Sequence, residues 1–228
     1  MKFKRSIATK IACVVGICVV GASHASAGRI LTFDGLKNFE QVDNYFNGGT
    51  GSLGSGPGPN YGITFSPYAL AYIPGQQTGK VTPFPGDPSP PTVLLTFNTA
   101  NPFGAGYPTS ITMDDSNGFS NGLVFYDIDI GRTGTVQIWS GADGLGTLLA
   151  QQSLPITPEA FSGPTTLLFP GTAHSVVFTG GNDQLAIDNI SFMTSAPAPE
   201  PSTFSSMLIG LGTLFVIFLV RRKKAAAL

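Results

Sequence analysis

Short apolar runs separated by clusters of glycine, proline, asparagine and aspartate fill the middle of this 228-residue chain. The run at 123–130 alternates its side chains with a period of two, which is the spacing of a strand with two different faces. The chain holds 29 glycines and 18 prolines, which interrupt helices and favour turns. No strong amphipathic helix is evident between the runs. We therefore expect the middle of the chain to be an all-β domain.

Ten segments have the length and composition of strands, and they recur at intervals near ten residues, as in sandwiches and barrels. They are 29–34, 61–65, 68–73, 92–97, 123–130, 135–139, 146–152, 165–169, 174–179 and 185–192. The run at 92–97 is continuously apolar, so we expect it to be buried on both faces. This pattern predicts a two-sheet antiparallel sandwich of the jelly-roll type, with an Ig-like topology as the alternative.

Three other stretches of the domain are less regular. Residues 36–46 suit either an irregular segment or one helical turn. Residues 48–60 hold six glycines and two prolines, and residues 74–91 hold six prolines. Such compositions disfavour helices and central strands, so we expect two long loops.

The first 27 residues have the order of a secretory signal peptide. Basic residues occupy the start, an apolar stretch covers 11–21, and Ala25 and Ala27 form an A-x-A cleavage site before Gly28. We expect export and cleavage by signal peptidase. Both cysteines of the chain lie before Ala25, so the mature domain has no thiol for a disulfide, a nucleophile or a metal site.

The last 33 residues have three parts in a fixed order. They are a Pro-rich linker at 196–203, an uncharged and largely apolar segment at 204–220, and a basic tail at 221–228. Seventeen helical residues rise about 25 Å, which is the short end of what spans a hydrocarbon core of about 30 Å. Basic residues favour the cytoplasmic side. We expect a transmembrane helix in the inner membrane, with the domain at 28–195 outside the cytoplasm.

This three-part tail resembles the PEP-CTERM sorting signal of Gram-negative bacteria that make exopolysaccharide. The residues that carry the resemblance are Pro199, Glu200, Pro201, Arg221 and Arg222. The resemblance implies recognition by an exosortase, removal of the helix, and delivery to the cell surface or extracellular matrix. The alternative is a permanently anchored single-span surface protein.

A second resemblance lies inside the domain. Parts of 45–66 and the segment 187–192 are similar to ectodomains that precede such tails, and this likeness supplies no catalytic residues. The domain at 28–195 has twelve Asp and Glu against four Lys and Arg, a net charge of about −8. Such a charge disfavours nucleic-acid binding, because phosphates need basic partners. Its length suits one domain with its own core.

Catalytic chemistry has little support in the sequence. His174 is the mature domain's histidine, and no G-x-S-x-G motif surrounds a serine that it could activate. Asp127 and Asp129 are two apart on a strand, about 7 Å, which is compatible with a glycosidase pair. A polar outer face explains these two carboxylates equally well. We therefore expect a non-catalytic envelope or matrix protein, with a secreted glycan-active hydrolase as the alternative.

Ligand binding has two candidate sets of residues. Asp34 and Asp188, in the first and last strands, resemble the pair that shares a structural calcium in carbohydrate-binding jelly rolls; otherwise they cap a turn and bond to backbone. We expect no other cofactor. Exopolysaccharide is the expected partner, and aromatic side chains are candidate platforms for sugar rings: Tyr68, Tyr72, Phe84, Tyr107 and Trp139.

Overall fold

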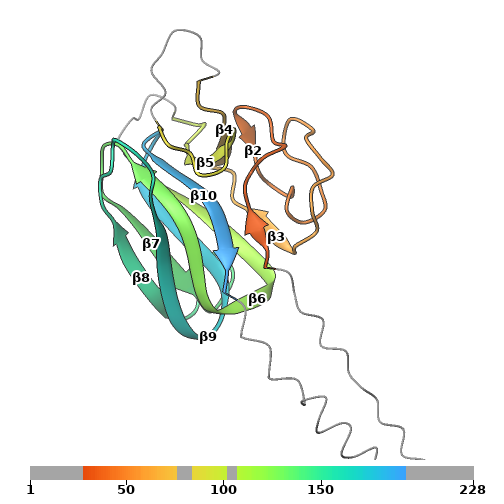
Figure 1. Ribbon diagram of the computed structural model, residues 1–228. Coiled ribbons are helices and arrows are strands. Elements are labelled where there is room, and N and C mark those ends of the chain that lie inside the picture. Colours follow the sequence, from red (N-terminus) through yellow and green to blue (C-terminus); the bar gives the residue numbers. More distant parts are fainter. Residues whose placement is uncertain (1–27, 76–83, 102–106, 194–228) are drawn as a thin grey trace, which may run out of the picture. The chain divides into compact units, whose positions relative to one another are not determined.

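A computed structural model describes residues 28–75, 84–101 and 107–193, in which ten strands form one antiparallel sheet (Figure 1). The strands are β1 (Ile30–Leu31), β2 (Glu40–Gln41), β3 (Ile63–Phe65), β4 (Ala69–Tyr72), β5 (Val93–Thr96), β6 (Pro108–Asp129), β7 (Gly134–Trp139), β8 (Leu148–Leu154), β9 (Ser162–Gly181) and β10 (Leu185–Phe192). The described residues contain no helix, so the all-β prediction is confirmed. Ser26–Ala196 form one compact unit.

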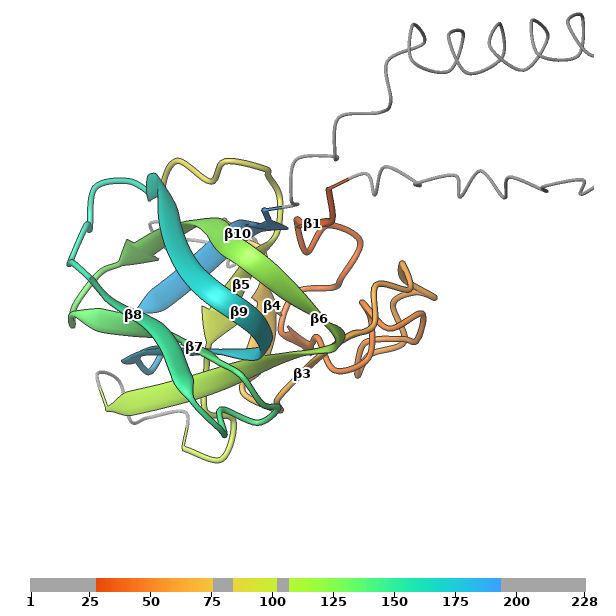
Figure 2. The same cartoon turned by 90° about the horizontal axis from the view of Figure 1, so that it is seen from below.

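The sheet has the strand order β2-β4-β5-β10-β6-β9-β7-β8, with β1 paired to β10 and β3 paired to β6. Strand β6 pairs with β9 along most of its length, but the register shifts between Asp114 and Phe119. Before the shift β6 also pairs with β3, and after it with β10. The two long strands therefore belong to two parts of the sheet, and Figure 2 shows both of them curving.

Gly118 lies within this register shift and has a φ of 72°. A Cβ at this position would lie 2.8 Å from the Thr172 side chain and 2.9 Å from the ring of His174. Only glycine combines the left-handed backbone with so little space. The irregularity in β6 thus depends on this residue.

The main core lies between the two parts of the bent sheet. Phe125 follows the register shift in β6, and Phe178 belongs to the part of β9 that pairs before the shift, yet their ring centroids are 5.3 Å apart and edge-to-face. A second buried cluster lies on the other side of β5 and β10: Tyr72, Phe84, Val93, Leu95, Ile128 and Ala186. The second cluster explains why strand β5 is buried on both faces, as the sequence predicts.

Several predicted boundaries change in the structure. The predicted strands 165–169 and 174–179 are one strand, β9, and β6 begins at Pro108 rather than near 123. The stretch 36–46 contains the two-residue strand β2 and turns rather than a helical turn. The loop at 48–60 has no strand, although Asn47 and Asn60 form an isolated bridge at its ends. The jelly-roll and Ig-like topologies stay predictions, since all described strands join one sheet.

The predicted helices of the two ends, in 1–27 and 204–220, lie outside the described residues. Within 28–75, 84–101 and 107–193 no helix is long and apolar enough to cross a membrane.

Candidate functional site

Asp127 and Asp129 lie near the end of β6, and both side chains are fully buried. A polar outer face is therefore the wrong explanation for them. Their register partners on β10 are Ile187 and Leu185, which belong to the main core. With no exposed surface, the two carboxyls are inaccessible to a glycan chain. Their position argues against the glycosidase pair.

The two buried carboxyls keep only part of their hydrogen bonding. Asp127 Oδ1 accepts from the Thr165 hydroxyl at 3.0 Å, and Asp129 Oδ1 accepts from the backbone N–H of Arg132 at 3.0 Å. The Oδ2 atom of each has no hydrogen-bond partner. Burial raises the pKa of both carboxyls, and in Asp127 the nearby Asp129 adds to the effect.

His174 lies on β9 beside a surface hollow of about 440 Å³. Its Nδ1 is 3.1 Å from the carbonyl oxygen of Asp115, and Ser116 in the same hollow donates its hydroxyl to the Gly62 carbonyl at 3.0 Å. Neither bond joins a serine to the histidine, so the hollow shows no serine–histidine pair. Polar side chains line it together with glycine and alanine, although most of the surface they expose there is apolar: Asn47, Gly62, Thr64, Asp114, Asp115, Ser116, Gly141, Ala142 and His174.

The predicted calcium ligand Asp188 lies in β10 and is fully buried. As the sequence suggests, the first and last strands are neighbours, because β1 pairs with β10. The structure pairs the Asp188 side chain with Asp87, which sequence reasoning missed. The Ser89 hydroxyl donates to Asp188 Oδ2 at 2.6 Å, and the Ser89 N–H reaches Asp87 Oδ1 at 3.0 Å and Asp188 Oδ2 at 3.2 Å.

The acids of this region affect their neighbours electrostatically. Burial, together with the nearby Asp87, raises the pKa of Asp188 to about 8. Burial likewise raises the pKa of Asp87, to which the charge of Asp34 adds. Asp87 lies in a Pro-rich loop that has no periodicity, so nothing in the sequence placed it opposite the last strand.

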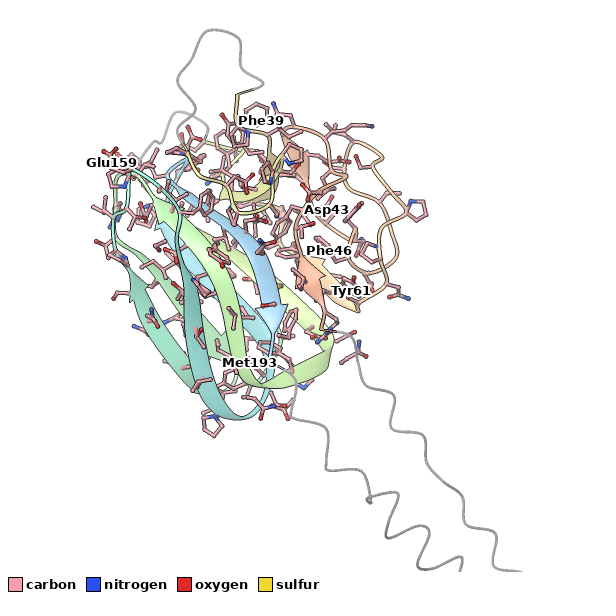
Figure 3. All side chains as sticks on the ribbon, viewed as in Figure 1. Phe39, Asp43, Phe46, Tyr61, Glu159 and Met193 are labelled. Atoms are coloured by element: carbon pink, nitrogen blue, oxygen red, sulfur yellow. The ribbon has the colours of Figure 1, made fainter. Side chains whose placement is uncertain are left out.

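The aromatic candidates divide by exposure. Tyr72 and Phe84 pack edge-to-face in the second cluster, with ring centroids 5.8 Å apart, and are buried. They offer no platform to a sugar. Tyr107 is 69% exposed, whereas Tyr68 and Trp139 are partly buried. Figure 3 labels another aromatic pair, Phe46 and Tyr61, which stack beside β3 with centroids 6.4 Å apart.

The residues of the predicted sorting signal lie outside the described residues, as do Ala25 and Ala27 of the predicted cleavage site. Comparison with protein families finds the PEP-CTERM protein-sorting motif at residues 197–223. The tail of the chain carries this sorting motif. No curated protein matches the chain.

The PEP-CTERM match contains all five residues on which the resemblance depends: Pro199, Glu200, Pro201, Arg221 and Arg222. The motif implies an exported protein that an exosortase system sorts to the envelope. The match begins at residue 197, after the last strand ends at Phe192. It therefore covers the tail and not the β-domain, whose role is a separate question.

Proposed function

We propose that this PEP-CTERM protein is a non-catalytic component of the cell surface or extracellular matrix whose β-domain associates with exopolysaccharide. The sorting motif at 197–223 is the observation that carries the proposal. In this proposal signal peptidase removes 1–27, the apolar segment at 204–220 holds an inner-membrane intermediate, and exosortase processing near Glu200 then frees the domain.

The geometry of the domain supports a binding role over a hydrolytic one. Asp127 and Asp129 are enclosed by the core, and His174 contacts a backbone carbonyl. A hydrolase of glycosidic bonds needs two carboxyls on either side of an accessible bond. The hydrolase remains the less supported alternative.

The hollow beside His174 is the surface that we assign to the polysaccharide. Asn47, Thr64 and Asp114 supply polar atoms there, and sugar hydroxyls form hydrogen bonds with such groups. Asp114 also accepts from the backbone N–H of Asp143 at 2.7 Å, which fixes the adjacent turn. The polymer would thus meet a rim built from β6, β9 and the turn after β7.

Mass spectrometry of the chain recovered from an exosortase-containing bacterium tests the sorting step. We expect a mature N-terminus at Gly28 and a C-terminus near Glu200. The double variant Pro199→Ala, Pro201→Ala should keep Arg221, whereas Pro197→Ala, in the same linker, should be processed normally. An intact basic tail in the parent protein would instead establish a permanent anchor.

A second experiment separates binding from catalysis. Labelled exopolysaccharide of the producing strain should be retained by the protein, with weaker retention by Asn47→Ala and His174→Ala and no release of reducing ends. Release of reducing ends that disappears in Asp127→Asn would contradict the non-catalytic proposal.

A further inference from the structure

Three aspartates, one after β1, one in the loop at 84–92 and one in β10, each hold a buried oxygen without a hydrogen-bond partner. The atoms are Asp34 Oδ1, Asp87 Oδ2 and Asp188 Oδ1. Asp188 has no exposed surface at all. Buried carboxylate oxygens are normally satisfied, so three such atoms in one region need an explanation.

The side chains of Asp87 and Asp188 lie close to each other. One backbone N–H, that of Ser89, reaches both carboxyls, at 3.0 Å from Asp87 Oδ1 and 3.2 Å from Asp188 Oδ2. Asp34 follows β1 and acts electrostatically on Asp87. Two neighbouring carboxylates, one fully buried and the other with one buried oxygen, repel each other unless a proton or a cation lies between them.

The described basic side chains do not supply that positive charge. Arg29 pairs with Asp115 at 2.6 Å, and Lys37 donates to the carbonyl of Leu53 at 2.7 Å. Arg132 acts on Asp129. Carboxylate and hydroxyl oxygens remain, and these are the ligands that hard divalent cations prefer.

We propose that Asp87 and Asp188 bind a calcium ion that fastens the loop at 84–92 to strand β10. The described residues contain no group of three or more His, Cys, Asp or Glu side chains that could hold a metal ion. The ion would therefore have these two carboxylates as its side-chain ligands, and backbone carbonyls and water would complete its shell of about six to eight oxygens.

Calcium rather than magnesium fits this donor set. Calcium accepts irregular geometry and several protein oxygens, whereas magnesium demands a near-octahedral shell and keeps most of its water. The ion would also join Asp87 and Asp188, which are 101 residues apart in the sequence. The loop at 84–92 and strand β10 already meet in the second buried cluster, through Phe84 and Ala186. This inference does not depend on the proposed function, because sorting by the tail requires no metal in the domain.

Isothermal titration of calcium chloride into the full-length protein, held in mild detergent and freed of metal by a chelator, tests the proposal. Extracellular calcium modules bind with a Kd of about 10⁻⁴–10⁻³ M, so the titration should extend to about 10 mM. We expect saturable binding in the parent, at least a tenfold weaker affinity in Asp87→Asn and Asp188→Asn, and a smaller loss in Asp34→Asn. Magnesium chloride should give no comparable heat.

Asp143→Asn is the matched control, because Asp143 is exposed on the turn after β7. The fluorescence of Trp139, the single tryptophan of the chain, reports whether each variant is folded and gives its unfolding midpoint with calcium and with chelator. Calcium should raise the unfolding midpoint of the parent and of Asp143→Asn, but not that of Asp87→Asn or Asp188→Asn. Absence of both heat and shift in the parent overturns the site, as does parent-like binding by folded Asp87→Asn.

Discussion

Asp127 illustrates how one residue can satisfy the sequence pattern and still be misread. The period of two correctly groups it with Phe125 and Asp129, but periodicity does not say which face is buried. At the end of β6 both faces are buried, because the main core lies on one side and the second cluster, which includes Ile128, lies on the other. The second cluster is built by residues distant in sequence, so a local pattern could not reveal it.

The substitution Asp127→Asn should stabilise the protein increasingly as pH rises. Burial raises the folded-state pKa of Asp127, so its ionised form disfavours folding. This penalty is absent below the ordinary pKa of 3.8 and develops as pH rises through the folded pKa. Urea unfolding at pH 4 and pH 8 should show a larger advantage of Asp127→Asn over the parent at pH 8. An advantage that is equal at both pH values would contradict this reading.

At the scale of elements, one buried acid anchors the glycine-rich loop at 48–60, in addition to the backbone hydrogen bonds of that loop. Glu40, in β2, is fully buried and accepts backbone N–H groups from Lys37 at 2.7 Å, Leu53 at 2.8 Å and Ser55 at 3.0 Å. A Cβ on Gly51 would lie 2.6 Å from Glu40 Oε1. The loop was predictable from composition, but its anchor was not, because Glu40 lies in the stretch with no clear pattern.

Glu40→Gln should therefore destabilise both the protein and this loop. Burial alone would raise the pKa of Glu40, but hydrogen bonds to Ser55, Lys37 and Leu53 lower it. Its stabilisation is present above the ordinary pKa and is lost as pH falls through the lower folded value. We expect a loss of about 2 kcal/mol at pH 7, since hydrogen bonds to charged groups contribute about 1.5–3 kcal/mol each.

Urea unfolding and limited proteolysis would measure this effect. The exposed Glu159→Gln, labelled in Figure 3, is the matched control and should behave as the parent. Cleavage within 48–60 should appear in Glu40→Gln only. Equal stability and equal protease resistance of the two variants would exclude the anchoring role.

The long strands show a second limit of local patterns. Pro170 and Gly171 predict separate strands at 165–169 and 174–179, and the sequence pattern predicts no strand between residues 97 and 123. In the structure the register of β6 and β9 shifts between Asp114 and Phe119 and again between Ser120 and Asn121, and pairing resumes beyond each shift. Such interruptions can be recognised as irregularities within one strand only once the pairing is known.

For the whole molecule, the class of fold and the tail were predictable because each rests on local features: period-two runs with turn residues, and a three-part order of proline, apolar and basic residues. The contacts by which Arg29 joins the start of the domain to its end could not be predicted from local features. Arg29 donates to Asp115 at 2.6 Å and to the Tyr61 carbonyl at 2.9 Å, and its guanidinium lies 4.4 Å from the centre of the Phe192 ring.

Arg29→Ala should destabilise the domain by about 3 kcal/mol, because removing one partner of a buried ion pair leaves the other charge uncompensated. The Asp115 side chain has no exposed surface, and that of Arg29 is 20% exposed. Arg29→Lys keeps the charge but not the planar fork, so its loss should be intermediate. Urea unfolding ranks the three proteins, and an unfolding free energy of Arg29→Ala equal to the parent's would show that the pair contributes nothing.

The pairing of Ile30 with Ser191 has a consequence for the proposed processing at both ends of the chain. Because β1 pairs with β10, the first and last strands of the domain are neighbours. Gly28 precedes β1, and Met193, labelled in Figure 3, follows β10. Cuts at 27 and near 200 fall outside every described strand. Cleavage at either end would therefore release the domain without breaking a hydrogen bond between these strands.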